Sequence, residues 1–577
     1  MNARNRLYLL LAGLLSLILV VAAACGDDDD GDDGDGEDTP AAGQTTTTGD
    51  GDRAPADQQQ VTLQLGEPQY LDPHRSSFEQ DIAIIRTMFR GLYNLTDNGE
   101  GGVDVVPAMA ADMPEVNGSV YTVRLKEGLM WSDGQPLTAQ HFVDGAKRGC
   151  NPQVATDYGY IWGPGYLDLQ GCGEWQSAED PAAPGLADAL AVRAVDDTTI
   201  EYTLNQPNDR FTMLMALWMT FPVRQELIDQ FGDAWTSPEN IVVNGPYILT
   251  EYNAGEGLVL EPNENWSGEA PALQRIEVRF LDNLSAAFTA YQNGELDITR
   301  IAATDIAVAE GDSALADEVL INPSGRITSL QMNMANAPLD NLDVRLALAR
   351  AIDRETLNDV VFEGTNTPAT YWVVPGVEGH QGNEAFDDII GFDPDAARQH
   401  LADAGYEGGA GFPTLTIVVH NDDYQRTAEF LQQQFQEILG INLEINRVDS
   451  QTRSQIFRDE TFELFIGGWQ LDYPDIENPL FGLFETDGGN NHYNCSHPDV
   501  DAALERALAA TSEEERIAAY QDMETAIITN VCGVAPMWND SLPYMVRSNL
   551  GGIVPNGTID AGWPGSYCVE CWYVKAE

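Results

Sequence analysis

Short strand-like segments alternate with helix-like segments through most of this chain, and no repeat period links them. Val61–Leu65 alternates apolar with polar residues, and so do Val120–Leu125 and Thr199–Leu204, as strands with one buried face do. Residues 343–357 instead carry apolar side chains spaced as on one face of a helix. This mixed order predicts an α/β fold with mixed sheets, and 577 residues suffice for several lobes.

Helix boundaries are marked in the second half of the chain. Asp393, followed by a proline, predicts an N-cap, and Gly405 predicts the end of that helix. A further helix is expected over 425–439, with a strand over 441–445 directly after it. A helix followed closely by a strand is the order that covers one face of a sheet.

The first 25 residues have the layout of an export signal. Arg4 and Arg6 precede an apolar run, Leu7–Ala24, which ends in small residues directly before Cys25. This is typical of a bacterial lipoprotein signal, in which the cysteine is lipidated and becomes the mature N-terminus. The alternative is an uncleaved membrane anchor, for which the run is only just long enough. Either interpretation places the rest of the chain outside the cytoplasm, tethered to the outer face of a membrane.

Composition limits the partners of the chain. Residues 26–57 are rich in Gly and Asp without an apolar period, which predicts a disordered acidic spacer. With 29 Lys and Arg against 92 Asp and Glu, the net charge of −63 excludes sequence-independent nucleic-acid binding. Self-repulsion at this charge favours a monomer. A cation-rich environment and a lineage with biased composition both remain explanations of the acidity.

The six cysteines after Cys25 are expected to form disulfides, because the chain lies in an oxidising compartment. Proximity favours three pairs: Cys150–Cys172, Cys495–Cys532 and Cys568–Cys571. A cluster of His492, Cys495 and His497 could be imagined as a metal site, but its Gly- and Pro-rich flanks indicate a loop. We therefore predict no metal site.

Catalytic signatures are missing from the sequence. It contains no Gly-x-Ser-x-Gly elbow, no His-Glu-x-x-His, no Walker A motif and no dinucleotide-binding glycine fingerprint followed by a helix. Carboxylates are so abundant that any proposed acid–base pair would be arbitrary. We expect no enzyme activity and no cofactor.

A series of motifs runs through residues 60–577. In chain order they are Glu67–Pro73, Phe89–Tyr93, Tyr121–Ala139, Asn244–Tyr247, Asn265–Trp266, Gly294–Asp297, Asp343–Asp353, Asp393–Tyr406 and Gly468–Asp475. Their order resembles the family 5 extracellular solute-binding proteins, the oligopeptide- and dipeptide-binding lipoproteins of ABC importers. The resemblance implies a two-lobed periplasmic-binding-protein-like fold of type II, with an extra subdomain in lobe I.

The same resemblance divides the chain into parts. They are a signal peptide (1–25), the spacer (26–57), a discontinuous lobe I (58–108, 240–325 and 533–577), the extra subdomain of lobe I (109–239) and lobe II (326–532). Closure of the two lobes about a hinge would bury a ligand between them.

The ligand site implied by the resemblance follows the apolar strand over 462–466. Gly468, Trp469 and Gln470 would line the ligand, and Asp472 would bind its α-ammonium. The mechanism would be addition of the peptide to the sheet as a further strand, which gives affinity without reading side chains. Two alternatives stay open: Asp472 as a turn-capping residue, and Trp469 as a core residue.

Other ligand contacts are less defined. Ser76 follows the Leu-Asp-Pro motif as a potential hydrogen-bonding residue, and Trp372 could stack on a sugar face. A ligand carboxylate could meet Arg326, Arg426 or Arg447, which the sequence does not rank. The function expected is capture of an oligopeptide for the membrane subunits of an ABC importer. The alternatives are the same role for another solute, such as an oligosaccharide, and a role outside transport.

Overall fold

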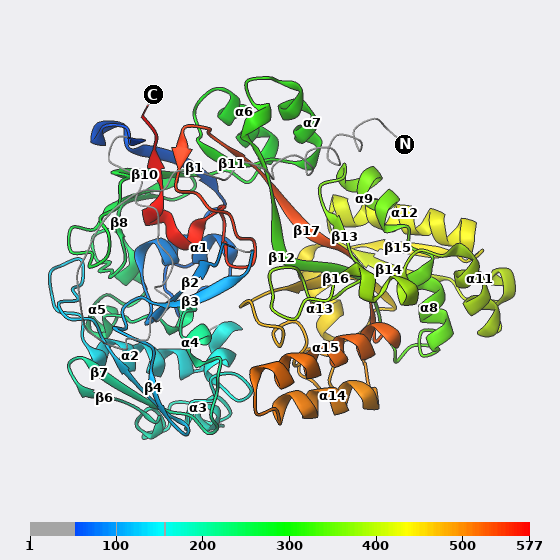
Figure 1. Cartoon of the computed structure of the whole chain (residues 1–577), viewed down its shortest axis with the longest axis horizontal. Coiled ribbons are helices and arrows are strands. Elements are labelled where there is room, and N and C mark those ends of the chain that lie inside the picture. The colour runs from blue at the N-terminus through cyan, green and yellow to red at the C-terminus, as the bar shows by residue number, and fades with distance from the viewer. Residues whose placement is uncertain (1–51, 100, 155–156, 577) are drawn as a thin grey trace, which may run out of the picture. The chain divides into compact units, whose positions relative to one another are not determined.

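The computed structural model describes residues 52–99, 101–154 and 157–576 (Figure 1). Cys25, the signal segment and most of the spacer lie outside the described residues. Among the described helices, none has the length and apolarity needed to cross a membrane.

The largest sheet has eleven strands. Ten follow one path, in the order β15 (Leu443–Arg447), β14 (Leu415–Val419), β16 (Leu464–Gln470), β12 (Val319–Met332), β17 (Val534–Val546), β11 (Ile298–Arg300), β1 (Gln60–Leu65), β10 (Arg275–Phe280), β9 (Gly257–Pro262) and β8 (Tyr247–Asn253); β13 (Thr367–Pro368) pairs with β17. The expected strand over 61–65 is thus confirmed as β1. The strand expected over 441–445 is displaced by two residues and forms β15.

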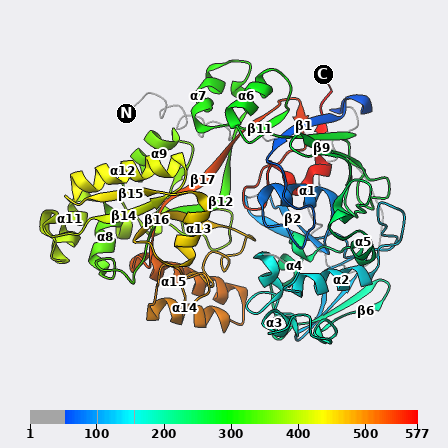
Figure 2. The ribbon, with the colours of Figure 1, turned by 180° about the vertical axis from the view of Figure 1, so that it is seen from behind.

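The long strands β12 and β17 connect two hydrophobic cores. Their antiparallel ladder runs from Val319–Met545 to Gln331–Val534 and is interrupted after Pro323. At the end near Met545 the neighbouring Tyr544 belongs to a core that contains β1 and β10 and is formed mainly by residues 61–278, and Met545 packs in a smaller cluster with residues 287–315. At the other end β12 and β17 pack in a second core formed mainly by residues 327–538. Each core is one lobe, and Figure 2 shows the two strands passing from one lobe to the other.

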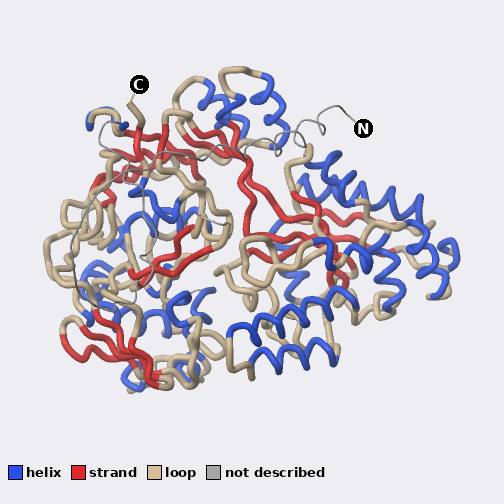
Figure 3. Tube along the Cα trace, viewed as in Figure 1, coloured by secondary structure: helices blue, strands red, loops and turns tan. Residues whose placement is uncertain are grey.

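Lobe II is rich in helices (Figure 3). They are α8 (Leu342–Arg350), α9 (Arg354–Phe362), α10 (Asp387–Ile390), α11 (Pro394–Asp403), α12 (Asp422–Ile438), α13 (Ser450–Arg458), α14 (Pro498–Leu508) and α15 (Glu513–Thr529). The single helix expected over 343–357 is wrong, because α8 ends at Arg350 and Asp353 caps the separate helix α9 by accepting the N–H of Thr356 at 3.0 Å. Asp393 caps α11 as predicted, and Asn421 starts α12 three residues before the expected position.

Lobe I combines the sheet with smaller units. The expected extra subdomain contains a four-stranded sheet, with the order β4 (Glu115–Asn117), β5 (Val120–Arg124), β7 (Thr199–Thr203) and β6 (Val192–Asp196). The remaining elements of lobe I are α1 (Glu79–Met88), β2 (Tyr93–Asp97), β3 (Val103–Pro107), α2 (Ala139–Cys150), α3 (Cys172–Gln176), α4 (Phe211–Leu214), α5 (Gln225–Phe231), α6 (Leu284–Gln292), α7 (Ala303–Gly311), β18 (Leu550–Gly551) and β19 (Tyr573–Val574). The residue limits expected for the lobes stay a prediction.

All three cysteine pairs are bonded as proximity suggested. Cys150–Cys172 joins α2 to α3, Cys495–Cys532 lies in lobe II, and Cys568–Cys571 lies near the C-terminus. Cys495 is therefore not available to a metal at the His492–His497 loop. No cluster of three His, Cys, Asp or Glu side chains that could hold a metal ion occurs among the described residues.

The folded part of the chain begins before residue 58. The N–H of Ala54 donates to the carbonyl of Val574 at 2.8 Å, and Arg53 lies over the ring of Tyr573. Gln59 ties the two ends together, because its amide donates to the carbonyls of both Ala54 and Val574. The end of the predicted spacer is therefore ordered, since backbone pairing with the C-terminal strand compensates for its poverty in apolar residues.

Candidate ligand-binding cleft

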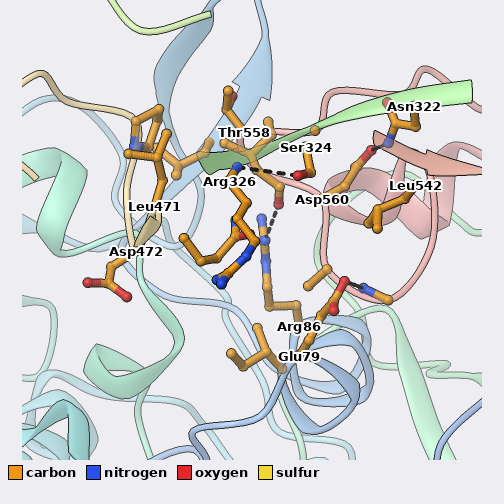
Figure 4. A pocket seen from close by; sticks show the side chains of 18 of the residues that line it. Glu79, Arg86, Asn322, Ser324, Arg326, Leu471, Asp472, Leu542, Thr558 and Asp560 are labelled. Atoms are coloured by element: carbon orange, nitrogen blue, oxygen red, sulfur yellow. Dashed lines mark hydrogen bonds between the residues drawn. The ribbon is translucent and has the colours of Figure 1, made fainter. Parts of the chain in front are cut away.

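A cavity of about 520 Å³ lies between the two lobes (Figure 4). Its walls come from α1, from the loop over 557–562, from the segment after β16 and from the crossing strands β12 and β17. This volume lies in the range of small-molecule sites. Because both lobes contribute walls, opening and closing of the lobes would open and close the cavity.

The β12 bulge shapes one wall of the cavity. Between Pro323 and Ile327 the ladder to β17 is interrupted, and the side-chain amide of Asn539 donates to the carbonyls of Ser324 (2.8 Å) and Arg326 (2.7 Å). A bulge redirects side chains, and here both Ser324 and Arg326 line the cavity.

Strand β16 presents an open edge next to the cavity. Its pairing with β14 involves Leu464 and Phe465 alone, whereas its pairing with β12 continues to Gln470. The N–H of Leu471 donates to β12, and antiparallel strands alternate the side to which backbone groups point. Gly468 and Gln470 therefore direct their backbone N–H and C=O away from β12. A peptide strand could pair with these groups.

The structure explains why β16 contains two glycines, which the sequence alone did not explain. A Cβ on Gly468 would overlap the carbonyl oxygen of Ile327, whereas one on Gly467 would meet the flexible end of Gln331 at 2.9 Å. The backbone that approaches Gly468 is thus its own neighbour β12. Its glycine identity is explained by strand packing rather than by a ligand.

Asp472 lies in the cavity wall and bridges the lobes. The hydroxyls of Tyr158 and Tyr160, in the extra subdomain, donate to its two carboxylate oxygens at 2.9 and 2.7 Å. Asn478 donates to the same carboxylate at 3.3 Å and accepts the N–H of Asp472 at 3.1 Å. Burial raises the pKa of Asp472, and these side-chain donors oppose the rise. The carboxylate is therefore held in place, with further lone pairs that an ammonium could use.

Trp469 does not line the cavity, but it helps to position Asn478, which binds Asp472. Its indole N–H donates to the side-chain oxygen of Asn478 at 2.8 Å, and its ring packs against the core of lobe II. Gln470 does line the cavity, with an exposed side chain. Of the four residues expected around the ligand, Gln470 and Asp472 therefore face the cavity, and Gly468 offers backbone groups.

Two further residues that were predicted to contact the ligand do not line the cavity. Trp372 is fully buried in lobe II, where its N–H donates to the carbonyl of Pro479 at 2.6 Å and its ring meets Phe484 edge to face. Its expected stacking on a ligand is wrong for this conformation, because the ring has no exposed face. Ser76 is also buried, and its neighbour Ser77 lines the cavity instead.

The structure ranks the three basic residues considered for a ligand carboxylate. Arg326 lines the cavity, where it lies 3.7 Å from Asp540 and donates to Tyr424. Arg426 and Arg447 pair with acids on the surface of α12. Neither of those two arginines belongs to the cavity lining.

Several cavity residues escaped sequence analysis. Glu79, Ile82 and Arg86 lie on one face of α1, Arg300 ends β11, and Asp560 belongs to the loop over 557–562. The spacing of the α1 residues could have predicted that their side chains share one helix face, since positions three and seven apart lie on the same side of a helix. No sequence pattern connects that face to the loop over 557–562, because they meet only in the folded chain.

The chain belongs to family 5 of the bacterial extracellular solute-binding proteins. The model of that family, described as "Bacterial extracellular solute-binding proteins, family 5 Middle", matches residues 104–491. This confirms the resemblance seen in the motif order. As a member of an extracellular family of solute-binding proteins, the chain works outside the cytoplasm.

Individual relatives cover most of the chain. The probable deoxycholate-binding periplasmic protein YgiS of Escherichia coli is 30% identical over 84% of this chain and 89% of its own length. The periplasmic oligopeptide-binding protein OppA of Escherichia coli is 26% identical over 86% and 89%. A crystal structure of the periplasmic oligopeptide-binding protein/oligopeptide ABC transporter OppAIV of Borrelia burgdorferi superposes with a TM-score of 0.70, at 27% identity over 88% and 99%. The expected two-lobed type II fold is thereby confirmed.

Proposed function

We propose that this chain is the substrate-binding component of an ABC importer and captures oligopeptides between its lobes. The observation that carries the proposal is the open edge of β16 beside a cavity that contains the carboxylate of Asp472. Main-chain pairing at Gly468 and Gln470 would hold peptides of many sequences, and Asp472 would bind the α-ammonium. Relatives named for oligopeptide binding support the same interpretation.

The proposal includes a membrane tether. Cys25 would carry the lipid, and the acidic segment after it would separate the lobes from the outer face of the cytoplasmic membrane. We propose a monomer, because the net charge of −63 opposes self-association. Closure around the peptide would create the surface that the membrane subunits of the importer recognise.

The test compares peptides with free and N-acetylated amino termini. Isothermal titration of tri- to pentapeptides should show binding that acetylation weakens, because the acetylated nitrogen has no charge for Asp472. Asp472→Asn should cost about 2–5 kcal/mol of binding free energy for free peptides. Asp522→Asn, at an exposed carboxylate on α15, is the control and should bind as the wild type does. If Asp472→Asn binds free peptides as tightly as the wild type does, Asp472 does not bind the α-ammonium and serves only to hold Tyr158 and Tyr160.

A second solute class has its own support. The relative that is 30% identical is named for deoxycholate, and Ile82, Leu95 and Leu217 give the cavity an apolar part. Binding of deoxycholate with no response to any peptide would move the function to that class. The oligosaccharide alternative loses Trp372, which is buried, whereas Tyr158 does line the cavity.

A further inference from the structure

Cations are scarce in this chain, yet three of them line one cavity. The whole sequence has 29 Lys and Arg against 92 Asp and Glu, and Arg86, Arg300 and Arg326 all belong to the walls between the lobes. The cavity therefore differs from the rest of an acidic molecule. The hydrogen bonds of each arginine show which of them is committed to the fold.

Two of the three arginines have partners. Arg86 donates to the carbonyl of Ile559 at 2.6 Å. Arg326 donates to Tyr424 and lies 3.7 Å from the carboxylate of Asp540. Both side chains thus help to join segments of the folded chain.

Arg300 differs from both. Its backbone N–H donates to Gln64, and β11 pairs it with Tyr544, so its position is fixed. Among the described residues its guanidinium has no hydrogen bond and no ion pair, and its Nε is buried. A buried guanidinium nitrogen without a hydrogen bond lowers stability, because its lost hydration is not replaced. The rest of the Arg300 side chain is partly exposed toward the cavity.

The described carboxylates that line the cavity with Arg300 accept hydrogen bonds from other groups, and none of them pairs with its guanidinium. Asp540 accepts from Thr328 at 2.6 Å and from Trp538 at 3.1 Å, beside Arg326. Glu79 accepts the N–H of Gly562 at 3.0 Å. Asp560 accepts from Asn322 at 3.3 Å and from the N–H of Asn556 at 2.8 Å through its Oδ2, whereas its buried Oδ1 has no side-chain partner among the described residues.

Arg300 also stands where two cavities meet. A smaller cavity of about 260 Å³ shares Glu79, Arg300 and Gly562 with the cavity between the lobes. A ligand group at Arg300 would therefore have space on either side. An anion that enters with the solute would supply the hydrogen-bond partner that the guanidinium lacks.

We propose that Arg300 is the anion subsite of the cleft, where its guanidinium binds a carboxylate of the captured solute. The planar guanidinium offers two parallel N–H groups to a carboxylate, which is a strong and directional pairing. The receptor therefore selects solutes with a free carboxylate. This inference rests on the proposed capture of a small solute in this cavity, and a peptide or a steroid acid could supply the carboxylate.

The experiment compares acids with their neutral analogues by isothermal titration of the full-length protein. The probes are tetra-alanine and its C-terminal amide, and deoxycholate and its methyl ester, so that the two sources of a carboxylate are distinguished. The wild type should prefer one acid over its neutral analogue by on the order of tenfold or more. Arg300→Gln should reduce this preference to about twofold or less and leave the affinity for the neutral analogue unchanged. Arg506→Gln, at an exposed ion pair of α14, is the matched control.

Thermal unfolding without ligand separates this role from a structural one. Arg300→Gln should keep or raise the melting temperature, because the substitution removes no hydrogen bond within the described chain. Arg345→Gln should lower it, since Arg345 donates to the carbonyls of Val531, Leu339 and Asn530 at 2.9 Å. A loss like that of Arg345→Gln, or an acid preference that survives Arg300→Gln, would overturn the inference. If no probe binds the wild type, the proposed function is wrong. The anion-binding role of Arg300 is tested separately, because a lowered melting temperature of Arg300→Gln without ligand would show that Arg300 stabilises the fold.

Discussion

Asp560 shows how the cavity wall changes the chemistry of one residue. Burial raises the pKa of Asp560 to about 7, although backbone N–H groups of Gly565 and Asn556 oppose the rise. In the folded state the carboxyl therefore holds a proton that it loses near pH 4 in the unfolded chain. A raised carboxyl pKa lowers the free energy of unfolding as the pH rises between these two values.

Asp560→Asn tests this pH dependence. The variant keeps an acceptor for the N–H of Asn556 but cannot ionise. Its melting temperature minus that of the wild type should increase from pH 4 to about pH 7 and then level off. Asp81, whose pKa burial raises to about 6, is present in both proteins and cancels in the difference. A difference that is constant with pH would contradict the assignment.

At the scale of single elements, the open edge of β16 depends on a glycine. Gly468→Ala should lower the free energy of unfolding by at least about 1–3 kcal/mol, because the new Cβ would overlap the backbone of Ile327. Gly467→Ala is the matched control and should cost less, since the side chain of Gln331 can move away. Urea unfolding of both variants measures the difference. Equal losses would indicate that β12 shifts to accommodate the alanine.

Elements also show where sequence patterns sufficed. Val61–Leu65 and the helix capped by Asp393 were predicted correctly, since their signals are local: alternation in one case and a capping side chain in the other. The helix expected over 343–357 was divided by Asp353, whose capping carboxylate overrode an apolar stripe. Asp472 was found through the family motif, whereas Arg300 has no local signal.

At the scale of the whole molecule, ion pairs join the lobes. Arg210, in the extra subdomain, pairs with Glu477 of lobe II, and Arg516 of lobe II lies 3.7 Å from Asp209. Arg516 is held by Asp475, with nitrogen–oxygen distances of 3.0 and 2.7 Å. Together with Tyr158 and Tyr160 on Asp472, these contacts favour closure of the lobes before a ligand is bound.

Replacing one buried pair should shift the balance between open and closed lobes. Arg210→Met combined with Glu477→Gln removes both charges, so neither is left buried alone. Small-angle X-ray scattering should then give a larger radius of gyration without ligand and the wild-type value at saturating ligand. The apparent affinity should fall by the fraction of closed protein lost. The control is Arg506→Ala, at an exposed pair; an unchanged radius in the double variant would show that these ions do not hold the lobes together.

The sequence by itself identified several elements, favoured the correct three disulfide pairs and identified the family, because these depend on residues near one another or on motifs in order. Tertiary structure alone decided which side chains face the cleft. Trp372 lies in the core, and Arg326 lines the cavity beside a bulge of β12. Arg300 lines the same cavity as α1 and the loop over 557–562. The physical reason is that burial and pairing depend on contacts between segments hundreds of residues apart. Such contacts leave no periodicity in the sequence.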